Sequence, residues 1–342
     1  MEKILTIVIP TYNMQDYLRR CLDSLIVSEE QMNKLEVLVI NDGSKDNSSA
    51  IAHEYQDKYP DTFRVIDKEN GNYGSCINRG LKEATGKYIK VLDADDWFDS
   101  NNFSKFISVL LKNNADLFVT PYNVVNEAGI ITGAHKFNLP SEKILSFVEA
   151  MNDSKFHKIA MHAVTYRTNI LKEIAYSQAE GISYTDNEWI FKPMLYVTTV
   201  FYSNLDVYQY LIGREGQTMS SAALIKNVKH HLIGCENMIK SIAGIDIKDE
   251  AKSKYINEKL LSRTAYVYRM YLTENVENGH EDICEFDKFI NFNAPSLYRA
   301  LEDVTLGNRN SLRFIKKWRE SGYKEKFIFY KCYLRIKRIL CK

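Results

Sequence analysis

Three aspartates in the segment Leu92-Asp93-Ala94-Asp95-Asp96 are the strongest candidates in this sequence for binding a metal or taking part in catalysis. They directly follow the apolar stretch Tyr88 to Leu92, which is typical of a buried strand. In an extended segment, residues i and i+2 project to the same side, so Asp93 and Asp95 can face one point. One or two such carboxylates suffice to bind a divalent cation that also takes substrate phosphates. The sequence therefore predicts a metal site on Asp93 and Asp95, although an isolated Asp-x-Asp is more often a solvated turn or a helix cap.

Two other polar turns follow apolar, β-branched runs and are candidates for binding a nucleoside. Pro10-Thr11-Tyr12-Asn13 follows residues 4–9, and Asn41-Asp42-Gly43-Ser44 follows residues 35–40. The glycine of the second turn permits a sharp change of direction, and Asp42 can accept hydrogen bonds from ribose hydroxyls or a base N–H. Taken singly, both turns are also ordinary loops or helix entries.

A candidate general base lies in Ser183-Tyr184-Thr185-Asp186-Asn187-Glu188-Trp189, just before a predicted helix over residues 189–196. A base must be an ionised acceptor within hydrogen-bond reach of the nucleophile's proton, and Asp186 or Glu188 can provide one. Carboxylates near a helix start also serve as caps or as partners of the helix dipole. The residues by themselves leave these alternatives open.

Two isolated polar residues complete the candidates. Arg214 lies between glycines in the segment Tyr210 to Ser220. Its guanidinium matches phosphate oxygens in a bidentate way and the glycines permit loop motion, but an exposed arginine in a turn explains the pattern equally well. His162 stands alone among apolar residues. Such a histidine is more often a satisfied core residue than a contact to an acceptor or phosphate, so it is left out of the predicted site.

These candidates need a fold that brings distant strand ends together. Short β-branched runs alternate with helical stretches through about residue 120, a pattern typical of βαβ units on a parallel sheet. Asn13 and Asp46 are candidate helix N-caps, and Gly86 follows a helix that ends near Ala84. Ligands of such sheets bind beyond the carboxyl ends of the strands, where the polar turns lie. We predict an α/β fold with a Rossmann-like, mostly parallel sheet flanked by helices, with strands at residues 4–9, 35–40, 63–66, 88–92 and 117–120.

The rest of the chain has a different pattern, mixed at first and then dominated by helical periodicity. The expected elements are a hairpin turn at 126–129, a helix at 141–151, a strand at 207–212 and helices at 252–272 and 311–319. The expected domains are a catalytic domain at 1–220, with a nucleotide-sugar-binding half at 1–120 and an acceptor half at 121–220, and a helical C-terminal region at 221–342.

Composition narrows the class of protein. Among 342 residues, 45 Lys and Arg nearly cancel 44 Asp and Glu, so the whole-chain charge gives no reason to expect a nucleic-acid partner. The six cysteines form no CxxC pair and no metal-ligand spacing. No signal-peptide pattern precedes the first strand, and no run of 18 apolar residues occurs. These features predict a cytoplasmic protein with free thiols.

The stretch from Lys324 to Lys342 holds seven Lys or Arg against one acidic residue, interleaved with aromatic and aliphatic side chains. A basic amphipathic helix of this kind can lie on anionic lipid, which would place the protein peripherally at the inner face of the membrane. A terminal helix packed on its own bundle explains the same pattern equally well.

Taken in order, the motifs resemble the large inverting glycosyltransferase family 2, of GT-A fold. The resemblance covers about residues 1–215 and is to bacterial transferases of capsular, exopolysaccharide or other cell-surface glycan synthesis. It rests on this succession: Ile7-Val8-Ile9-Pro10-Thr11-Tyr12-Asn13, Asn41-Asp42-Gly43-Ser44-Lys45-Asp46, Asn70-Gly71-Asn72-Tyr73-Gly74, Leu92-Asp93-Ala94-Asp95-Asp96 and Thr185-Asp186.

The resemblance implies a nucleotide-diphosphate-sugar donor, most often UDP-linked, and a Mg²⁺ or Mn²⁺ ion on the motif Asp93-Ala94-Asp95. Thr185 stands where the family commonly has Glu, which keeps Glu188 as an alternative base. The Gln/Arg-x-x-Arg-Trp element and the membrane helices of processive synthases are missing, so a single addition to a saccharide or lipid-linked acceptor fits best. The resemblance implies that Asp95 binds the metal, that Asp93 binds the metal or the ribose, and that Asp186 is the base. It also implies that Arg214 belongs to a segment that covers the donor. The residues implied to line the nucleoside pocket are Pro10, Thr11, Tyr12 and Asp42.

The predicted reaction is direct displacement at the anomeric carbon, with inversion and with Asp186 as the base. Two other enzyme classes fit less well. A nucleotidyltransferase would carry a Gly-rich, basic phosphate loop after the first strand, a dehydrogenase would carry GxGxxG there, and residues 10–13 offer neither. The alternative that is not an enzyme is a protein of the same fold that binds nucleotide sugars, or acts as a scaffold, without catalysis.

Overall fold

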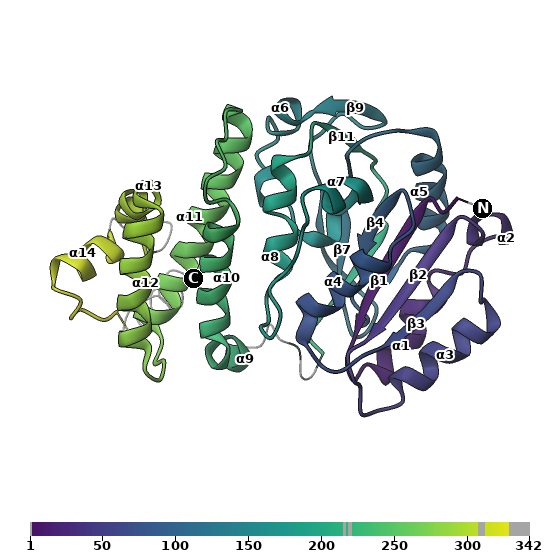
Figure 1. Cartoon of the computed structure of the whole chain (residues 1–342), viewed down its shortest axis with the longest axis horizontal. Helices are drawn as coiled ribbons and strands as arrows, with labels where there is room; N and C mark the ends of the chain where they lie inside the picture. The colour runs from purple at the N-terminus through teal and green to yellow at the C-terminus, as the bar shows by residue number, and fades with distance from the viewer. Residues whose placement is uncertain (1, 215–216, 218–220, 307–311, 328–342) are drawn as a thin grey trace. The chain divides into compact units, whose positions relative to one another are not determined.

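The structure is a computed structural model that describes residues 2–214, 217, 221–306 and 312–327 (Figure 1). The chain divides into two compact units, Met1–Glu215 and Gly216–Lys342, which we describe separately. None of the helices in the described ranges is both long and apolar enough to cross a membrane. Most of the basic segment predicted to contact lipid, from residue 328 onward, lies outside the described residues, so membrane contact stays a prediction.

The first unit is built on an eight-stranded sheet of order β3-β2-β1-β4-β10-β6-β11-β9. The strands β3, β2, β1 and β4 run parallel and lie side by side (Figure 1), and β6 pairs parallel with β11, whereas β10 and β9 are antiparallel to their neighbours. The mostly parallel α/β sheet is therefore confirmed. Its strands are β1 (Leu5–Thr11), β2 (Leu35–Asn41), β3 (Phe63–Asp67), β4 (Tyr88–Val91), β6 (Leu117–Val119), β9 (Lys143–Ser146), β10 (Val164–Arg167) and β11 (Thr199–Tyr202).

Helices connect the parallel strands and cover the sheet. Helix α4 packs on β1 and β2, and α1 packs against α3. The approach of α4 to β1 requires Gly80, because a Cβ there would lie 2.4 Å from Val8 Cγ1. The connecting helices are α1 (Gln15–Asp23), α2 (Glu29–Met32), α3 (Ser48–Lys58), α4 (Asn72–Glu83) and α5 (Ser100–Lys112).

A second, four-stranded sheet of order β5-β12-β7-β8 completes the first unit. It contains the predicted hairpin, whose turn places Gly129 at a φ of +76°. Strand β12 pairs with β5 and β7, and confirms the strand predicted at 207–212. Because β5 directly follows the Asp93 to Asp96 run, this pairing brings two distant parts of the chain together. The strands are β5 (Trp97–Phe98), β7 (Tyr122–Asn126), β8 (Ile131–His135) and β12 (Tyr208–Ile212).

Two helices expected in this region are wrong in type or length. Residues 143–146 form β9, and the capping box of Ser146 with Glu149 starts the short helix α6 (Phe147–Ala150) only afterwards. The helix expected over 189–196 is split into α8 (Asp186–Trp189) and a 3₁₀ turn, η3 (Lys192–Leu195), because Pro193 has no backbone N–H to continue an α-helix. The other short elements are η1 (Phe156–Lys158), η2 (Met161–Ala163) and α7 (Thr168–Glu173).

The second unit is helical, as predicted. Helix α11 confirms the helix expected at 252–272, and α14 begins at Phe314 instead of 311. Around α11 the core holds Tyr268 and Trp318, whose rings lie 5.8 Å apart. Within the described residues its elements are α9 (Ser221–Lys226), α10 (Val228–Ser241), α11 (Glu250–Thr273), α12 (Gly279–Asn293), α13 (Pro295–Ala300), η4 (Leu301–Asp303) and α14 (Phe314–Glu320).

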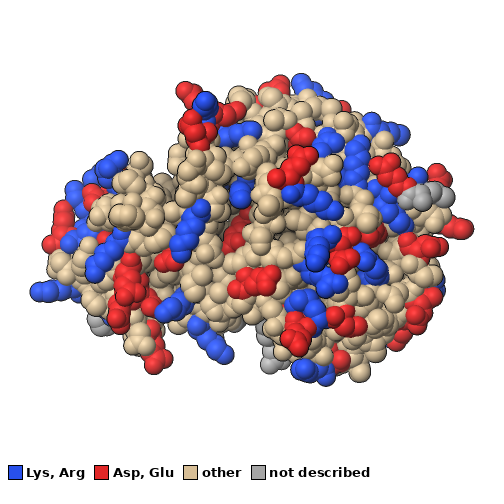
Figure 2. All heavy atoms as spheres, in the orientation of Figure 1, with Lys and Arg blue, Asp and Glu red and all other residues tan. Residues whose placement is uncertain are grey.

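Surface charge and thiols agree with the composition. On the face shown in Figure 2, acidic and basic side chains are interspersed without a large patch of one sign. Cys21, Cys76, Cys235 and Cys284 are free thiols, and the two remaining cysteines lie outside the described residues.

Candidate active site

The loops that follow β1 and β2 are bonded to each other. Asn13 Oδ1 accepts a hydrogen bond from the Lys45 backbone N–H at 2.7 Å, and Asp46 accepts one from the first residue of α1 at 3.0 Å. The N-caps of α1 and α3 are Met14 and Asn47, one position after the predicted Asn13 and Asp46. The predicted caps thus join the two loops, which fixes the carboxyl ends of β1 and β2 side by side.

The residues predicted to bind a nucleoside lie at these strand ends. Pro10 is half-buried, Thr11 is buried with its hydroxyl bonded to Ile9 O at 3.2 Å, and Tyr12 is exposed. Asp42 is buried, and its backbone N–H donates to Thr11 O at 2.8 Å. The structure therefore brings all four predicted residues to one edge of the sheet.

Asp42 also has a structural role that the sequence did not reveal. Its Oδ1 accepts from the Lys68 ammonium and, at 2.9 Å, from the backbone N–H of Gly71. Lys68 also donates to Ser75 Oγ at 2.9 Å. Asp42 therefore fixes the turn from β3 into α4 and places a cation beside the predicted nucleoside pocket.

Two tyrosines bind the carboxylates that follow β4. Tyr73 donates its hydroxyl proton to Asp93 at 2.9 Å. Tyr208, on β12, donates to Asp96 at 2.6 Å and accepts from the Asp93 backbone N–H at 3.2 Å. Ala94, between the two predicted ligands, is buried. These tyrosines were missed from the sequence, since nothing local relates Tyr208 to a turn more than 100 residues earlier.

Asp95 forms an ion pair with Arg214, with 2.5 Å between Oδ2 and Nε. Both side chains are largely buried, with exposed fractions of 13% and 12%. A second cation, Arg20, donates to Asp95 O at 3.1 Å and stacks 3.8 Å from the centre of the Trp97 ring. Arg214, predicted to bind a diphosphate, is thus placed directly at the predicted metal ligand.

The electrostatics of this cluster favour a bound cation. Burial, followed by the charges of Asp95 and Asp186, raises the pKa of Asp93 to about 7. Burial, followed by the charges of Asp95 and Asp93, also raises the pKa of Asp96. Asp93, Asp96 and His162 each offer a ligand atom within 4.8 Å of the others. Crowded carboxylates beside an imidazole fit a divalent cation, which would relieve their mutual repulsion. Asp93 belongs both to the predicted pair and to this group.

His162, which was left out of the predicted site, therefore lies at it. Burial, followed by the charge of Lys90, lowers the pKa of His162 to about 3, so its imidazole is neutral. Lys90 is fully buried in β4 and donates to His162 O at 2.8 Å. Burial lowers the pKa of Lys90 to about 7. A lysine inside an otherwise apolar strand was the available sequence signal for this arrangement.

The two candidate bases on α8 have different surroundings. Asp186 is half-buried, and its charge contributes to the raised pKa of Asp93 and, after burial and Asp93 itself, to that of Tyr73. Glu188 is buried, and its Oε2 accepts from the Ala179 backbone N–H at 2.9 Å. Burial raises the pKa of Glu188 to about 7. The charge of Asp186 thus acts on the carboxylate cluster, whereas Glu188 holds the segment that precedes α8 through its hydrogen bond to Ala179.

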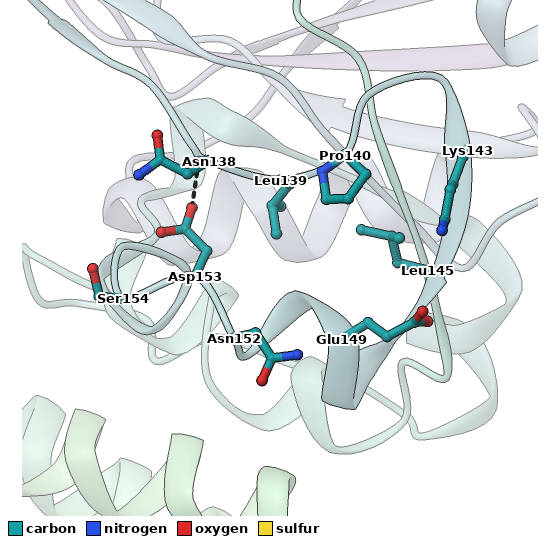
Figure 3. Close-up of a pocket in the computed structure, with 9 residues that line it drawn as sticks. All are labelled: Asn138, Leu139, Pro140, Lys143, Leu145, Glu149, Asn152, Asp153 and Ser154. Carbon is teal, nitrogen blue, oxygen red and sulfur yellow. Dashed lines mark hydrogen bonds between the residues drawn. The ribbon is translucent and has the colours of Figure 1, made fainter.

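One hollow of the first unit, of about 390 Å³, contains none of these residues (Figure 3). The two carboxylates that line it already have partners. Asp153 accepts from the Asn138 backbone N–H at 2.7 Å, and Glu149 caps α6. The hollow therefore offers no unpaired carboxylate for chemistry.

Sequence comparisons identify relatives of the first unit. Residues 6–174 match the family model of glycosyl transferase family 2. The chain is 35% identical over 159 residues to the uncharacterized glycosyltransferase MG025 of Mycoplasma genitalium, which covers 42% of this chain and 52% of that protein. It is 26% identical over 257 residues to a poly(ribitol-phosphate) beta-glucosyltransferase of Bacillus spizizenii, covering 73% of this chain and 38% of that protein. The chain thus spans about half or less of the length of these relatives.

Solved structures show the same fold. TarS 1-349 of S. aureus, in complex with UDP-GlcNAc, superposes with a TM-score of 0.72 at 18% identity, over 98% of this chain and 92% of that one. The mannosyltransferase PcManGT of Pyrobaculum calidifontis, in complex with GDP-Man and Mn²⁺, gives a TM-score of 0.50 at 13% identity, over 88% and 83% of the two chains. The first unit therefore has the GT-A fold and carries a glycosyl transferase family 2 domain at residues 6–174.

Proposed function

We propose that this protein is an inverting glycosyltransferase that moves a sugar from a UDP-linked donor to a hydroxyl of a saccharide or lipid-linked glycan of the cell surface. The observation that carries the proposal is the shared location of a half-buried carboxylate, Asp186, and the carboxylate cluster at Asp93 to Asp96. Family membership and the names of the relatives, which include poly(ribitol-phosphate) transferases, support it.

In this proposal, residues 1–120 bind the donor and residues 121–220 bind the acceptor. The nucleoside occupies the edge formed by Thr11, Tyr12 and Asp42, with Lys68 beside it. Arg214 binds the diphosphate through its guanidinium, which matches phosphate oxygens in geometry and charge. Because Arg214 is paired with Asp95 here, binding of the donor exchanges one anionic partner of the arginine for another.

Asp186 accepts the proton of the acceptor hydroxyl, and the oxygen attacks the anomeric carbon from the face opposite the diphosphate. The new C–O bond forms as the bond to the diphosphate breaks, so the configuration inverts. Asp93 and Asp95 would hold a Mn²⁺ or Mg²⁺ ion, which when bound stabilises the charge of the leaving diphosphate. Arg214, which is paired with Asp95, would add to that stabilisation.

A thermal-shift panel of nucleotide sugars, with and without Mn²⁺, tests the proposal. A ligand at 100 times its Kd stabilises the folded state by about 2.7 kcal/mol, so a bound donor is expected to raise the Tm measurably. Asp95→Ala is expected to lose the metal-dependent part of the shift. Release of UDP on addition of an acceptor then separates an enzyme from a silent binding protein. Absence of any donor shift together with absence of release would overturn the proposal.

A further inference from the structure

The proposed transfer assigns no role to His162, although the structure holds this side chain firmly. Its ring lies between three tyrosine rings, with centres 5.0 Å from Tyr122, 4.8 Å from Tyr208 and 4.4 Å from Tyr210. Its backbone oxygen accepts from Lys90, a fully buried residue of β4, the strand that leads directly into Asp93. The imidazole is therefore fixed relative to the carboxylate cluster.

This imidazole is incompletely bonded. His162 Nδ1 is buried and has no hydrogen-bond partner among the described residues. Buried polar atoms are nearly always paired, so an unpaired one in a rigid aromatic setting calls for a specific explanation. A ring nitrogen of His162 and one oxygen each of Asp93 and Asp96 lie within 4.8 Å of one another. The side chain is thus positioned next to anionic ligand atoms.

We propose that His162 supplies a nitrogen ligand to the divalent cation at Asp93 and that this nitrogen makes the site select Mn²⁺ over Mg²⁺. The inference rests on the proposed function and extends it to the choice of metal. With bonds of about 2.1 Å, donor atoms on an octahedral ion are about 3.0 Å apart when adjacent and about 4.2 Å apart when opposite. The three ligand atoms, which all lie within 4.8 Å of one another, would therefore have to move inward to coordinate one ion.

The selectivity follows from ligand chemistry. Mg²⁺ takes oxygen ligands and keeps several waters, whereas the divalent first-row transition metals, of which Mn²⁺ is the weakest binder, also accept an imidazole nitrogen. The carboxylates alone would accept either ion. Adding a neutral imidazole at a fixed position strengthens binding of Mn²⁺ more than that of Mg²⁺, so His162 is a specificity-determining residue for the metal.

The first test compares metal affinities of the whole chain by calorimetry, with Mn²⁺ or Mg²⁺ in the presence of UDP. His162→Gln is expected to weaken Mn²⁺ binding about tenfold or more and Mg²⁺ binding less than about threefold. His135→Gln is the matched control, because His135 stacks on Tyr122 at 4.5 Å but is exposed and outside the group of ligands. It is expected to leave both affinities unchanged. Equal weakening of both ions by His162→Gln would indicate a packing role and overturn the proposal.

The second test has its main readout on the wild-type protein. Pulsed EPR of Mn²⁺ bound to the wild-type chain is expected to show ¹⁴N modulation from a directly bonded imidazole, and His162→Gln or His162→Asn removes it. Bound Mn²⁺ without nitrogen modulation would overturn the role of His162 and leave the proposed transferase intact. If wild-type protein binds no metal but still releases UDP in EDTA, the metal inference fails alone. If it shows neither metal binding nor release, both proposals fail.

Discussion

The two halves of the first unit differ in how their buried polar groups are satisfied. In residues 2–112 the polar loops bond to one another, as Asn13 does with the loop after β2 and Asp42 does with Lys68 and Gly71. Among the described residues of this unit, all but one of the buried side-chain atoms without a partner lie in residues 115–214, and they include atoms of His162 and Thr185. The first half is a completed framework, whereas the second keeps unsatisfied groups.

This difference indicates where a substitution will affect stability and where it will affect chemistry. Removing one partner of a satisfied buried pair leaves the other unpaired, which costs about 1–3 kcal/mol for neutral groups and more for charged ones. Removing a group that has no partner in the folded protein should change the free energy of unfolding little. We therefore expect the loss of a satisfied buried partner in the first half to lower stability, whereas the loss of an unpartnered group in the second half should leave stability nearly unchanged.

The largest expected effect is on catalysis, from Asp186→Asn. The amide cannot accept the acceptor's proton as a carboxylate does, so transfer is expected to fall about 10²- to 10⁴-fold while the donor still binds. UDP release and thermal shift with donor measure the two properties. Glu188→Gln is the matched control on the same helix and should keep most of the activity. Transfer at the wild-type rate by Asp186→Asn would remove Asp186 as the base.

The second effect is on folding, from Asp42→Ala. The change leaves the Lys68 ammonium and the Gly71 N–H without their buried acceptor, and is expected to cost about 3 kcal/mol in ligand-free urea unfolding. Glu54→Ala breaks the exposed pair with Arg19 and should cost much less, because solvent screens that pair. If both variants unfold like the wild type, the first half is not the satisfied framework described above.

The third prediction concerns pH and Glu188→Gln. Burial raises the pKa of Glu188 from 4.5 to about 7, so ionising this group costs stability in the folded protein. Its contribution is fully present below about pH 4.5 and is lost as pH rises through 7. The Gln variant lacks that loss and is expected to be more stable than the wild type at pH 8 by about 1–3 kcal/mol, with little difference at pH 4.5.

Unfolding of both proteins at pH 4.5 and pH 8 measures this difference, with the exposed Glu180→Gln as the nearby control. If the free energy of unfolding changes with pH equally in the wild type and in Glu188→Gln, burial does not disfavour the ionised form of Glu188. That result would weaken the contrast between the two halves.

The smallest effect is expected from Thr185→Val. The Thr185 hydroxyl is buried without a partner, so its replacement by a methyl group of similar shape should leave the free energy of unfolding within about 0.5 kcal/mol of the wild type. Thr11→Val, which removes a bond to Ile9 O, should cost about 1 kcal/mol. A loss of more than 1 kcal/mol at Thr185 would contradict the comparison. A loss of transfer with unchanged stability would assign the hydroxyl to the substrate.

Much of the first half was predictable because its determinants are local. The apolar runs and turn residues placed β1, β2, β3 and β4 to within two residues, and the polar turns marked their carboxyl ends. The region from 141 to 196 was harder. There a capping box and Pro193 divide what periodicity alone suggests are continuous helices. The candidate base at Asp186 was found only because its motif follows the others in order.

By itself the sequence determined which residues end each parallel strand, because strand periodicity and turn chemistry act over a few neighbours. Only the tertiary structure decided the partners of those residues. The pairing of β12 with β5 brings Tyr208 to Asp96, and the segment after β12 brings Arg214 to Asp95. The place of β10 beside β4 brings His162 to the same cluster. Such contacts join residues from about 70 to about 120 positions apart, and they depend on strand order, which no local pattern encodes.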